Sequence, residues 1–132
     1  MPDTATDPQD FSGNWHCSYW FPSNQRPGSQ DISEYDVVAE QTGNQLVLQS
    51  TPNQEGSYMF VRLMLDGVFA AGSWTENTSP TGEFAGMMYS GVTQLIISDD
   101  QRTMTGKWVG VGRDLQRQQP DIYDGRWELK RI

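Results

Sequence analysis

The chain has only one cysteine, Cys17, and one histidine, His16, among its 132 residues. A single cysteine cannot form an intramolecular disulfide, and a lone thiol is typical of a reducing compartment, so we expect a cytoplasmic protein. Zinc and copper sites of the usual kind need several such ligands, which excludes a metal of that type. Neighbouring residues of a strand point to opposite faces, so His16 and Cys17 cannot act together as base and nucleophile.

Basic residues are also scarce: 9 Lys and Arg stand against 17 Asp and Glu, and the formal net charge is -8. Such a field repels phosphate backbones and anionic lipid headgroups, so we expect neither nucleic acid nor a membrane as partner. No run approaches the roughly 18 apolar residues of a membrane helix, and no signal-peptide pattern opens the chain. Phosphate loops, dinucleotide fingerprints and nucleophile elbows are missing as well, so we expect no cofactor.

Glycine and aromatic residues are abundant, with 13 Gly and five each of Trp, Tyr and Phe. This balance favours strands and tight turns over helices. A chain of this length supports one compact core, which we place in residues 11–132. Residues 1–10 have no apolar periodicity, and we expect them to be a disordered arm or a lid.

Apolar or alternating runs, separated by turn residues, predict eight strands in this domain. The runs cover residues 13–21, 33–41, 45–50, 57–65, 68–76, 84–98, 103–113 and 122–132. Short connections such as Asp66-Gly67 are typical of hairpins, and Gly86 and Gly91 predict a bend or bulge in the sixth run. Eight strands joined by nearest-neighbour hairpins predict a closed antiparallel up-and-down β-barrel, with a β-sandwich as the alternative.

The pattern Gly-x-Trp occurs four times and ends at Trp15, Trp74, Trp108 and Trp127. In a strand each Gly shares a face with its Trp, so the missing side chain leaves room beside the indole. Alternating small and large residues are typical of the inner wall of a narrow barrel. We expect some of the four indoles to pack the barrel and the others to line a cavity.

The first copy, Gly13-Asn14-Trp15, resembles the calycin superfamily of lipocalins, fatty-acid-binding proteins and avidins. In that superfamily a Gly-x-Trp opens the first strand, and its indole closes one end of the barrel, often under an arginine of the last strand. The resemblance implies a lipocalin-like barrel in which Arg131 supplies the cation over an aromatic ring.

A longer resemblance covers most of residues 11–132. It is carried by the phrases WHCSYWFPSN (15–24), GSYMFVRL (56–63) and TSPTGEF (78–84). These are similar to a bacterial, chiefly actinobacterial, domain that often follows a helix-turn-helix in transcriptional regulators. The resemblance implies a sensing or ligand-binding role, although this chain itself shows no helix-turn-helix segment.

Alternation places a set of aromatic side chains on the inner wall, and apolar walls with a few phenol groups are typical of a ligand pocket. The predicted ligand-binding residues are Tyr19, Tyr35, Trp74, Tyr89, Trp108, Tyr123 and Trp127, with Glu76 at the cavity mouth. The run 57–65 is apolar on both faces around Arg62. We expect Arg62 to be either a polar ligand contact or an anchor of a homodimer interface.

Two functions are compatible with these patterns. The first is a small-molecule-binding barrel, a carrier or sensor of a hydrophobic or aromatic ligand in the central cavity. The alternative is a cofactor-free natural-product cyclase, a pericyclase of the [4+2] type, that holds a polyketide-like substrate in a reactive conformation. The sequence identifies neither the ligand nor a catalytic residue.

Overall fold

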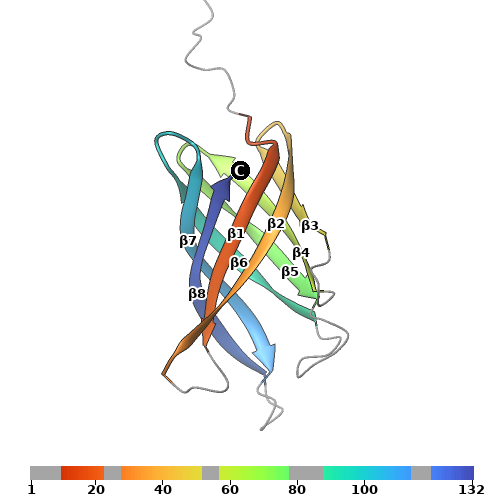
Figure 1. Cartoon of the computed structure of the whole chain (residues 1–132), viewed down its shortest axis with the longest axis vertical. Helices are drawn as coiled ribbons and strands as arrows, with labels where there is room; N and C mark the ends of the chain where they lie inside the picture. The colour runs from red at the N-terminus through yellow and green to blue at the C-terminus, as the bar shows by residue number, and fades with distance from the viewer. Residues whose placement is uncertain (1–9, 23–27, 52–56, 78–87, 114–119) are drawn as a thin grey trace, which may run out of the picture.

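A computed structural model of the chain describes residues 10–22, 28–51, 57–77, 88–113 and 120–132. The described residues form eight antiparallel strands that close into one barrel, each pairing with its neighbours in sequence and β1 pairing with β8 (Figure 1). The strands are β1 (Gly13–Pro22), β2 (Gln30–Thr42), β3 (Gln45–Ser50), β4 (Tyr58–Asp66), β5 (Phe69–Asn77), β6 (Met88–Ile97), β7 (Thr103–Arg113) and β8 (Pro120–Arg131). The predicted up-and-down barrel is confirmed, and the β-sandwich is excluded. The predicted arm or lid at 1–10 lies outside the described residues except for Asp10.

The sixth strand differs from its prediction. It begins at Met88, and the predicted residues 84–87, Gly86 among them, lie outside the described part of the chain. Of the bend or bulge predicted in the sixth run, a bulge at Gly91 is wrong, because β6 pairs with β5 and β7 in unbroken register through this residue. Packing explains why position 91 is a glycine: a Cβ there would collide with the Val109 carbonyl oxygen and lie 2.9 Å from Cζ2 of Trp74.

The barrel has two ends that differ in how the strands are joined. At the hairpin end, uppermost in Figure 1, short turns join β2 to β3, β4 to β5 and β6 to β7, and the chain finishes at Ile132. Gly43 and Gly67 adopt φ angles of 60° and 62° in two of these turns. That left-handed region is open to glycine without strain, as hairpin turns require. We call the opposite end, where β1, β3, β5 and β7 finish, the site end.

Burial divides the interior along the same axis. Aliphatic side chains less than 2 % exposed fill the hairpin end and the middle of the barrel: Leu46, Leu48, Leu63, Leu95, Met104 and Leu129. Toward the site end the inward side chains become aromatic, and several are only partly buried: Tyr19, Phe21, Tyr89 and Tyr123. The hairpin half is therefore a packed apolar core, whereas the inner wall at the site end keeps some access to solvent.

Trp15 closes the hairpin end in the way that the calycin resemblance implies. Its buried indole donates from Nε1 to the carbonyl oxygen of Phe11 at 2.8 Å. The Arg131 guanidinium lies 5.4 Å from the centre of the Trp15 ring, which confirms the predicted cation over an aromatic face. The same guanidinium donates to the carbonyl oxygens of Asp10, at 3.0 Å, and Ser12, at 2.7 Å. Arg131 thus fixes the segment that enters β1 to the end of the barrel.

Candidate functional site

Glu76 places a carboxyl group inside the aromatic half of the barrel, where it is 9 % exposed. The Tyr19 hydroxyl donates to Oε2 of Glu76 at 2.5 Å, and the Tyr35 hydroxyl donates to the same oxygen. The two phenol rings are stacked, with their centres 6.4 Å apart. Glu76 lies on β5, whereas Tyr19 and Tyr35 lie on β1 and β2, which are not its neighbours in the sheet. These hydrogen bonds therefore cross the interior of the barrel.

The electrostatics of this cluster are those of a buried acid. Burial raises the pKa of Glu76 above its usual value, and the hydrogen bonds from Tyr19 and Tyr35 oppose that rise. Burial, followed by the negative charge of Glu76, also raises the pKa of both phenols, so they remain protonated donors at neutral pH.

Among the basic residues whose side chains the structure describes, none forms an ion pair with Glu76. Five of these basic side chains are exposed to solvent: Arg62, Arg102, Lys107, Arg126 and Lys130. Arg131 lies at the hairpin end over Trp15, and His16 binds carboxylates on the outer face. In the described part of the chain, the carboxyl is compensated by phenol hydrogen bonds alone.

Four packed rings, those of Tyr19, Trp74, Trp108 and Trp127, form an aromatic box that meets this carboxyl through Tyr19. The ring centres of Trp74 and Trp108 are 5.7 Å apart and those of Trp74 and Trp127 are 6.2 Å apart, both edge to face. Tyr19 meets Trp108 edge to face at 6.1 Å and Trp127 at 6.3 Å. Such spacings are those of directly packed aromatic pairs, so the rings hold one another in place.

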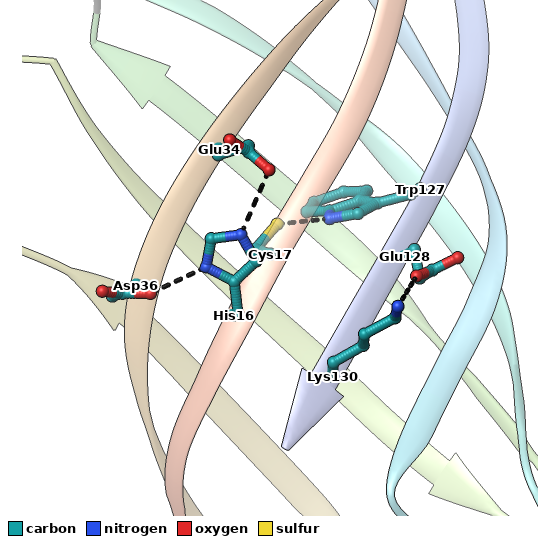
Figure 2. Close-up of polar contacts among 7 residues, drawn as sticks. All are labelled: His16, Cys17, Glu34, Asp36, Trp127, Glu128 and Lys130. Atoms are coloured by element: carbon teal, nitrogen blue, oxygen red, sulfur yellow. Dashed lines mark hydrogen bonds and ion pairs between the residues drawn. The ribbon is translucent and has the colours of Figure 1, made fainter. Parts of the chain in front are cut away.

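Each indole of the box donates its N–H to a group of the protein. Nε1 of Trp74 donates to the Val92 carbonyl oxygen at 3.1 Å, and Nε1 of Trp108 donates to the Trp20 carbonyl oxygen at 2.9 Å. Nε1 of Trp127 donates to Sγ of Cys17 at 2.6 Å, as Figure 2 shows. The indoles are therefore fixed in orientation and present ring surface rather than a donor.

The Gly-x-Trp repeats interlock between strands in a way that the sequence pattern did not reveal. Trp108 on β7 pairs with Gly125 on β8, and Gly106 on β7 pairs with Trp127 on β8. A Cβ on Gly125 would lie 2.6 Å from Nε1 of Trp108. Gly125 thus makes room for the indole of the neighbouring repeat, whereas a Cβ on Gly106 would collide with the Gln94 carbonyl oxygen.

Trp74 is accommodated by two glycines outside the repeats, Gly91 on β6 and Gly110 on β7. A Cβ on Gly110 would lie 2.5 Å from Cζ2 and 2.8 Å from Cη2 of Trp74. The indole of β5 therefore extends along the wall over the next two strands. The sequence alone could not predict the role of Gly110, because that role depends on Trp74, which lies two strands away.

Most of the predicted ligand-binding residues come together at the site end. Glu76, Tyr35 and the four rings of the aromatic box form one connected group, and Tyr89 and Tyr123 are partly buried against the same core. Trp15, by contrast, belongs to the hairpin end. The four indoles also differ in exposure. Trp15 and Trp127 are 0 % and 1 % exposed, whereas Trp74 and Trp108, both in the aromatic box, are each 7 % exposed.

Arg62 does not join this group. It is exposed on the outer face of β4, with its guanidinium 5.7 Å from the centre of the Phe60 ring. The inner face of β4 is instead formed by Met59, Val61 and Leu63, all buried. Of the two roles predicted for Arg62, this position favours the interface, which stays a prediction.

His16 and Cys17 point to opposite faces of β1, as alternation predicts (Figure 2). Burial raises the pKa of the Cys17 thiol to about 12, so the thiol stays protonated beside Trp127 at neutral pH. On the outer face, ring nitrogens of His16 contact Oδ1 of Asp36 at 2.8 Å and Oε1 of Glu34 at 3.3 Å. The hydrogen bond with Asp36 raises the pKa of His16. His16 therefore lies outside the aromatic box, and Cys17 meets the box through its protonated thiol, which accepts from Trp127.

A separate hollow of about 340 Å³ lies at the hairpin end and is open to solvent. Its lining includes Phe11, Gln41, Asn44, Leu65 and Gln101. None of the predicted ligand-binding residues lines it. The hollow is a feature of the turns rather than of the aromatic interior.

The raised pKa of Glu76 leads to a prediction for the pH dependence of folding stability. An acid whose pKa is higher in the folded state than in the unfolded state stabilises the fold while protonated, and that contribution is lost as the pH rises above the unfolded value. For Glu76 the loss begins near the usual value of 4.5 and is complete once the pH exceeds the raised folded value. The variant Glu76→Gln removes this loss.

We therefore expect Glu76→Gln to unfold at a higher temperature than the wild type at neutral pH, with the difference shrinking toward pH 4.5. Each 1 kcal/mol gained appears as roughly 3–5 °C in Tm for a domain of this size. Thermal unfolding across this pH range measures the difference, and Glu40→Gln, which removes a charge from the exposed face of β2, is the control. A Glu76→Gln variant that is equally destabilised at every pH would contradict the prediction.

The chain is thus an eight-stranded antiparallel β-barrel, consistent with a calycin-like fold and compatible with ligand binding. No protein-family model matches the chain, and neither a curated protein nor a solved structure matches it. The resemblance to an actinobacterial sensing domain therefore stays a prediction. None of the described segments forms a helix with the length and apolarity of a membrane span.

Proposed function

We propose that the barrel binds a small molecule, largely apolar or aromatic, against the aromatic box at its site end. The observation that carries the proposal is Glu76, a buried carboxyl that no basic side chain of the described residues neutralises. Removing a carboxylate from water without an opposite charge is unfavourable, so folding alone gives no reason to keep one there. Ionisable groups with such perturbed pKa values cluster at functional sites.

The arrangement of the interior supports binding at this end rather than in the middle. The packed hairpin half forms a floor, and the inward side chains above it are aromatic and partly exposed. Ligand sites typically combine apolar walls with a few fixed polar groups, which here are Glu76 and its two phenol partners. A carrier or a sensor needs nothing more than this, because its task ends with binding.

Tryptophan fluorescence tests the proposal directly. A ligand in the box lies beside Trp74 and Trp108, so titration with a library of small aromatic and apolar compounds is expected to change the emission of the wild type. Trp108→Phe is expected to lose most of that change, whereas Trp20→Phe retains it, because Trp20 lies on the outer face under Arg126. Binding at about 100 times Kd adds about 2.7 kcal/mol of stability, so a rise in Tm must accompany the optical signal.

Two outcomes would contradict the proposal. One is an emission change that Trp20→Phe abolishes and Trp108→Phe leaves intact, since the ligand would then sit on the outer wall. The other is the absence of any change in emission or Tm across the whole library.

Cyclisation of a bound substrate is the second candidate function. The observation that favours it is again Glu76, because a buried carboxyl with a raised pKa is suited to hold and release a proton beside a constrained substrate. Holding reacting carbons close together supplies much of the rate enhancement in such reactions. Mass spectrometry of the ligand after incubation separates the two functions: a carrier or sensor returns it unchanged, and a cyclase returns an isomer.

We also propose that the protein forms a homodimer through the outer face of β4. Tyr58 and Met64 are 44 % and 49 % exposed on this face. Exposed apolar side chains also occur on β6, β7 and β8, among them Val92, Val111 and Ile122, so exposure alone does not single out β4. Light scattering on the wild type and on Met64→Glu tests the proposal: a monomer in both would contradict it.

A further inference from the structure

The residues of the site end also indicate the charge of the ligand. We infer that the ligand is a cation: an ammonium or amidinium group on an apolar or aromatic body, held between Glu76 and the aromatic box. This inference rests on the proposed function and narrows it to one chemical class. Three independent features of the described residues support it.

The first feature is a carboxyl that has no opposite charge among the described side chains. Glu76 lies inside the barrel with two phenol donors on Oε2 and no described cation near it. A bound ammonium group would supply the missing opposite charge in a place where water screens it little. The carboxylate then gains a partner only when the ligand is present, which is the arrangement expected of a recognition site.

The second feature is the distribution of cations over the tryptophans. Trp15 lies under Arg131 and Trp20 lies under Arg126, each with the guanidinium 5.4 Å from a ring centre. The three indoles of the box have no such partner among the described side chains. Indole is the best aromatic partner for a cation, and cages of aromatic rings are used to bind quaternary ammonium groups. Among the described side chains, the box therefore has the composition of a cation site without a cation of its own.

The third feature is the direction of the hydrogen bonds. The N–H groups of Trp74, Trp108 and Trp127 are committed to protein acceptors, and the hydroxyls of Tyr19 and Tyr35 donate to Glu76. The box thus presents ring surface and a carboxylate rather than free donors. A carboxylate or phosphate ligand needs donors and would also face Glu76 and a net charge of -8. These groups select against anions.

A matched pair of probes tests the inference with the full chain. Benzyltrimethylammonium carries a permanent positive charge, and neopentylbenzene is its uncharged isostere with carbon in place of nitrogen. Phenylacetate provides the anionic comparison. We expect the wild type to bind the ammonium probe ~10-fold or more tightly than the isostere and to bind phenylacetate least, measured by tryptophan fluorescence and by Tm.

The variant Glu76→Gln is expected to lose most of the preference for the ammonium probe while still binding the isostere. Glu40→Gln removes the same charge from the outer face of β2 and is expected to keep the preference. This pair separates the local carboxylate from the general negative field of the protein, which acts on both variants alike.

A pH series on the wild type gives a second measurement that needs no variant. Binding of the ammonium probe is expected to strengthen as the pH rises through the raised pKa of Glu76, because only the ionised carboxyl attracts the cation. Binding of the isostere is expected to stay level. Among the described residues, the other titratable groups that face Glu76 are the phenols of Tyr19, Tyr35 and Tyr89 and the thiol of Cys17, classes that titrate at higher pH than carboxyls.

The outcomes distinguish this inference from the function on which it rests. If the isostere or phenylacetate binds as tightly as the ammonium probe, the guest is not a cation, although the barrel still binds small molecules. The same conclusion follows if Glu76→Gln keeps the full preference. If none of the three probes changes the emission or Tm, the cationic guest is overturned, and a library in which neutral compounds also fail overturns binding altogether.

Discussion

Gly110→Ala is expected to destabilise the barrel by on the order of 3 kcal/mol, through overpacking and a weakened hydrogen bond. The new Cβ would lie 2.5 Å from Cζ2 of Trp74, closer than two carbon atoms can approach. Trp74 would have to move, and its hydrogen bond to the Val92 carbonyl oxygen would lengthen from 3.1 Å. The change appears as a fall in Tm of roughly 10 °C and in chemical denaturation as a lower midpoint.

A double-mutant cycle shows whether the indole is the cause. The six-membered part of the Trp74 ring makes the closest contacts with the added Cβ, and Phe at this position lacks those atoms; the next contact, to the Ser90 carbonyl oxygen, is 3.2 Å. In a Trp74→Phe background, Gly110→Ala is therefore expected to cost about 1 kcal/mol or less. Equal costs in both backgrounds would show that Gly110 is not required by Trp74.

Arg131→Met is expected to lower the free energy of unfolding by about 2–4 kcal/mol, because it removes a cation–π contact and two hydrogen bonds from a charged group, one of them weakened by exposure to solvent. Methionine keeps an apolar stem over Trp15 but loses the donors to the carbonyl oxygens of Asp10 and Ser12. The segment entering β1, with Phe11 buried beneath it, then loses its attachment to β8. Denaturant unfolding followed by fluorescence measures the loss.

Arg131→Lys is the matched control for this prediction. Lysine keeps the positive charge near the Trp15 ring but cannot direct a planar fork at two carbonyl groups. It is expected to recover part of the stability lost in Arg131→Met. A change below about 0.5 kcal/mol in Arg131→Met, within the range of ordinary surface substitutions, would contradict the role assigned to this residue.

Alternation in the sequence was sufficient to predict the barrel and much of its inner wall. In an up-and-down barrel, side chains alternate between the two faces of each strand, and short hairpins join the strands. Residues close together in the sequence determine both features. The same alternation put Tyr19, Tyr35 and Glu76 on the inner face. It did not show that their polar groups meet, because β5 faces β1 and β2 only after the barrel has closed in one register.

The predictions that failed or stayed open depended on side-chain packing that the local sequence does not encode. A glycine in a strand is compatible with a bulge or with an indole lying over it, and only the position of Trp74 shows that Gly91 is the second case. The run 57–65 is apolar on both faces, so alternation did not decide which face is inside. Packing decides it: Val61 and Leu63 enter the core, and Arg62 points outward.

The central claim is that a small molecule binds beside Glu76 within the aromatic box, and the side-chain N–H signals of the tryptophans in a 1H–15N correlation spectrum test it most directly. With a bound probe such as benzyltrimethylammonium, the signals of Trp74, Trp108 and Trp127 are predicted to shift together. Those of Trp15, enclosed at the hairpin end, and Trp20, on the outer wall, are predicted to stay in place. Shifts confined to Trp15 or Trp20, or five unchanged signals with every compound that binds, would contradict the account.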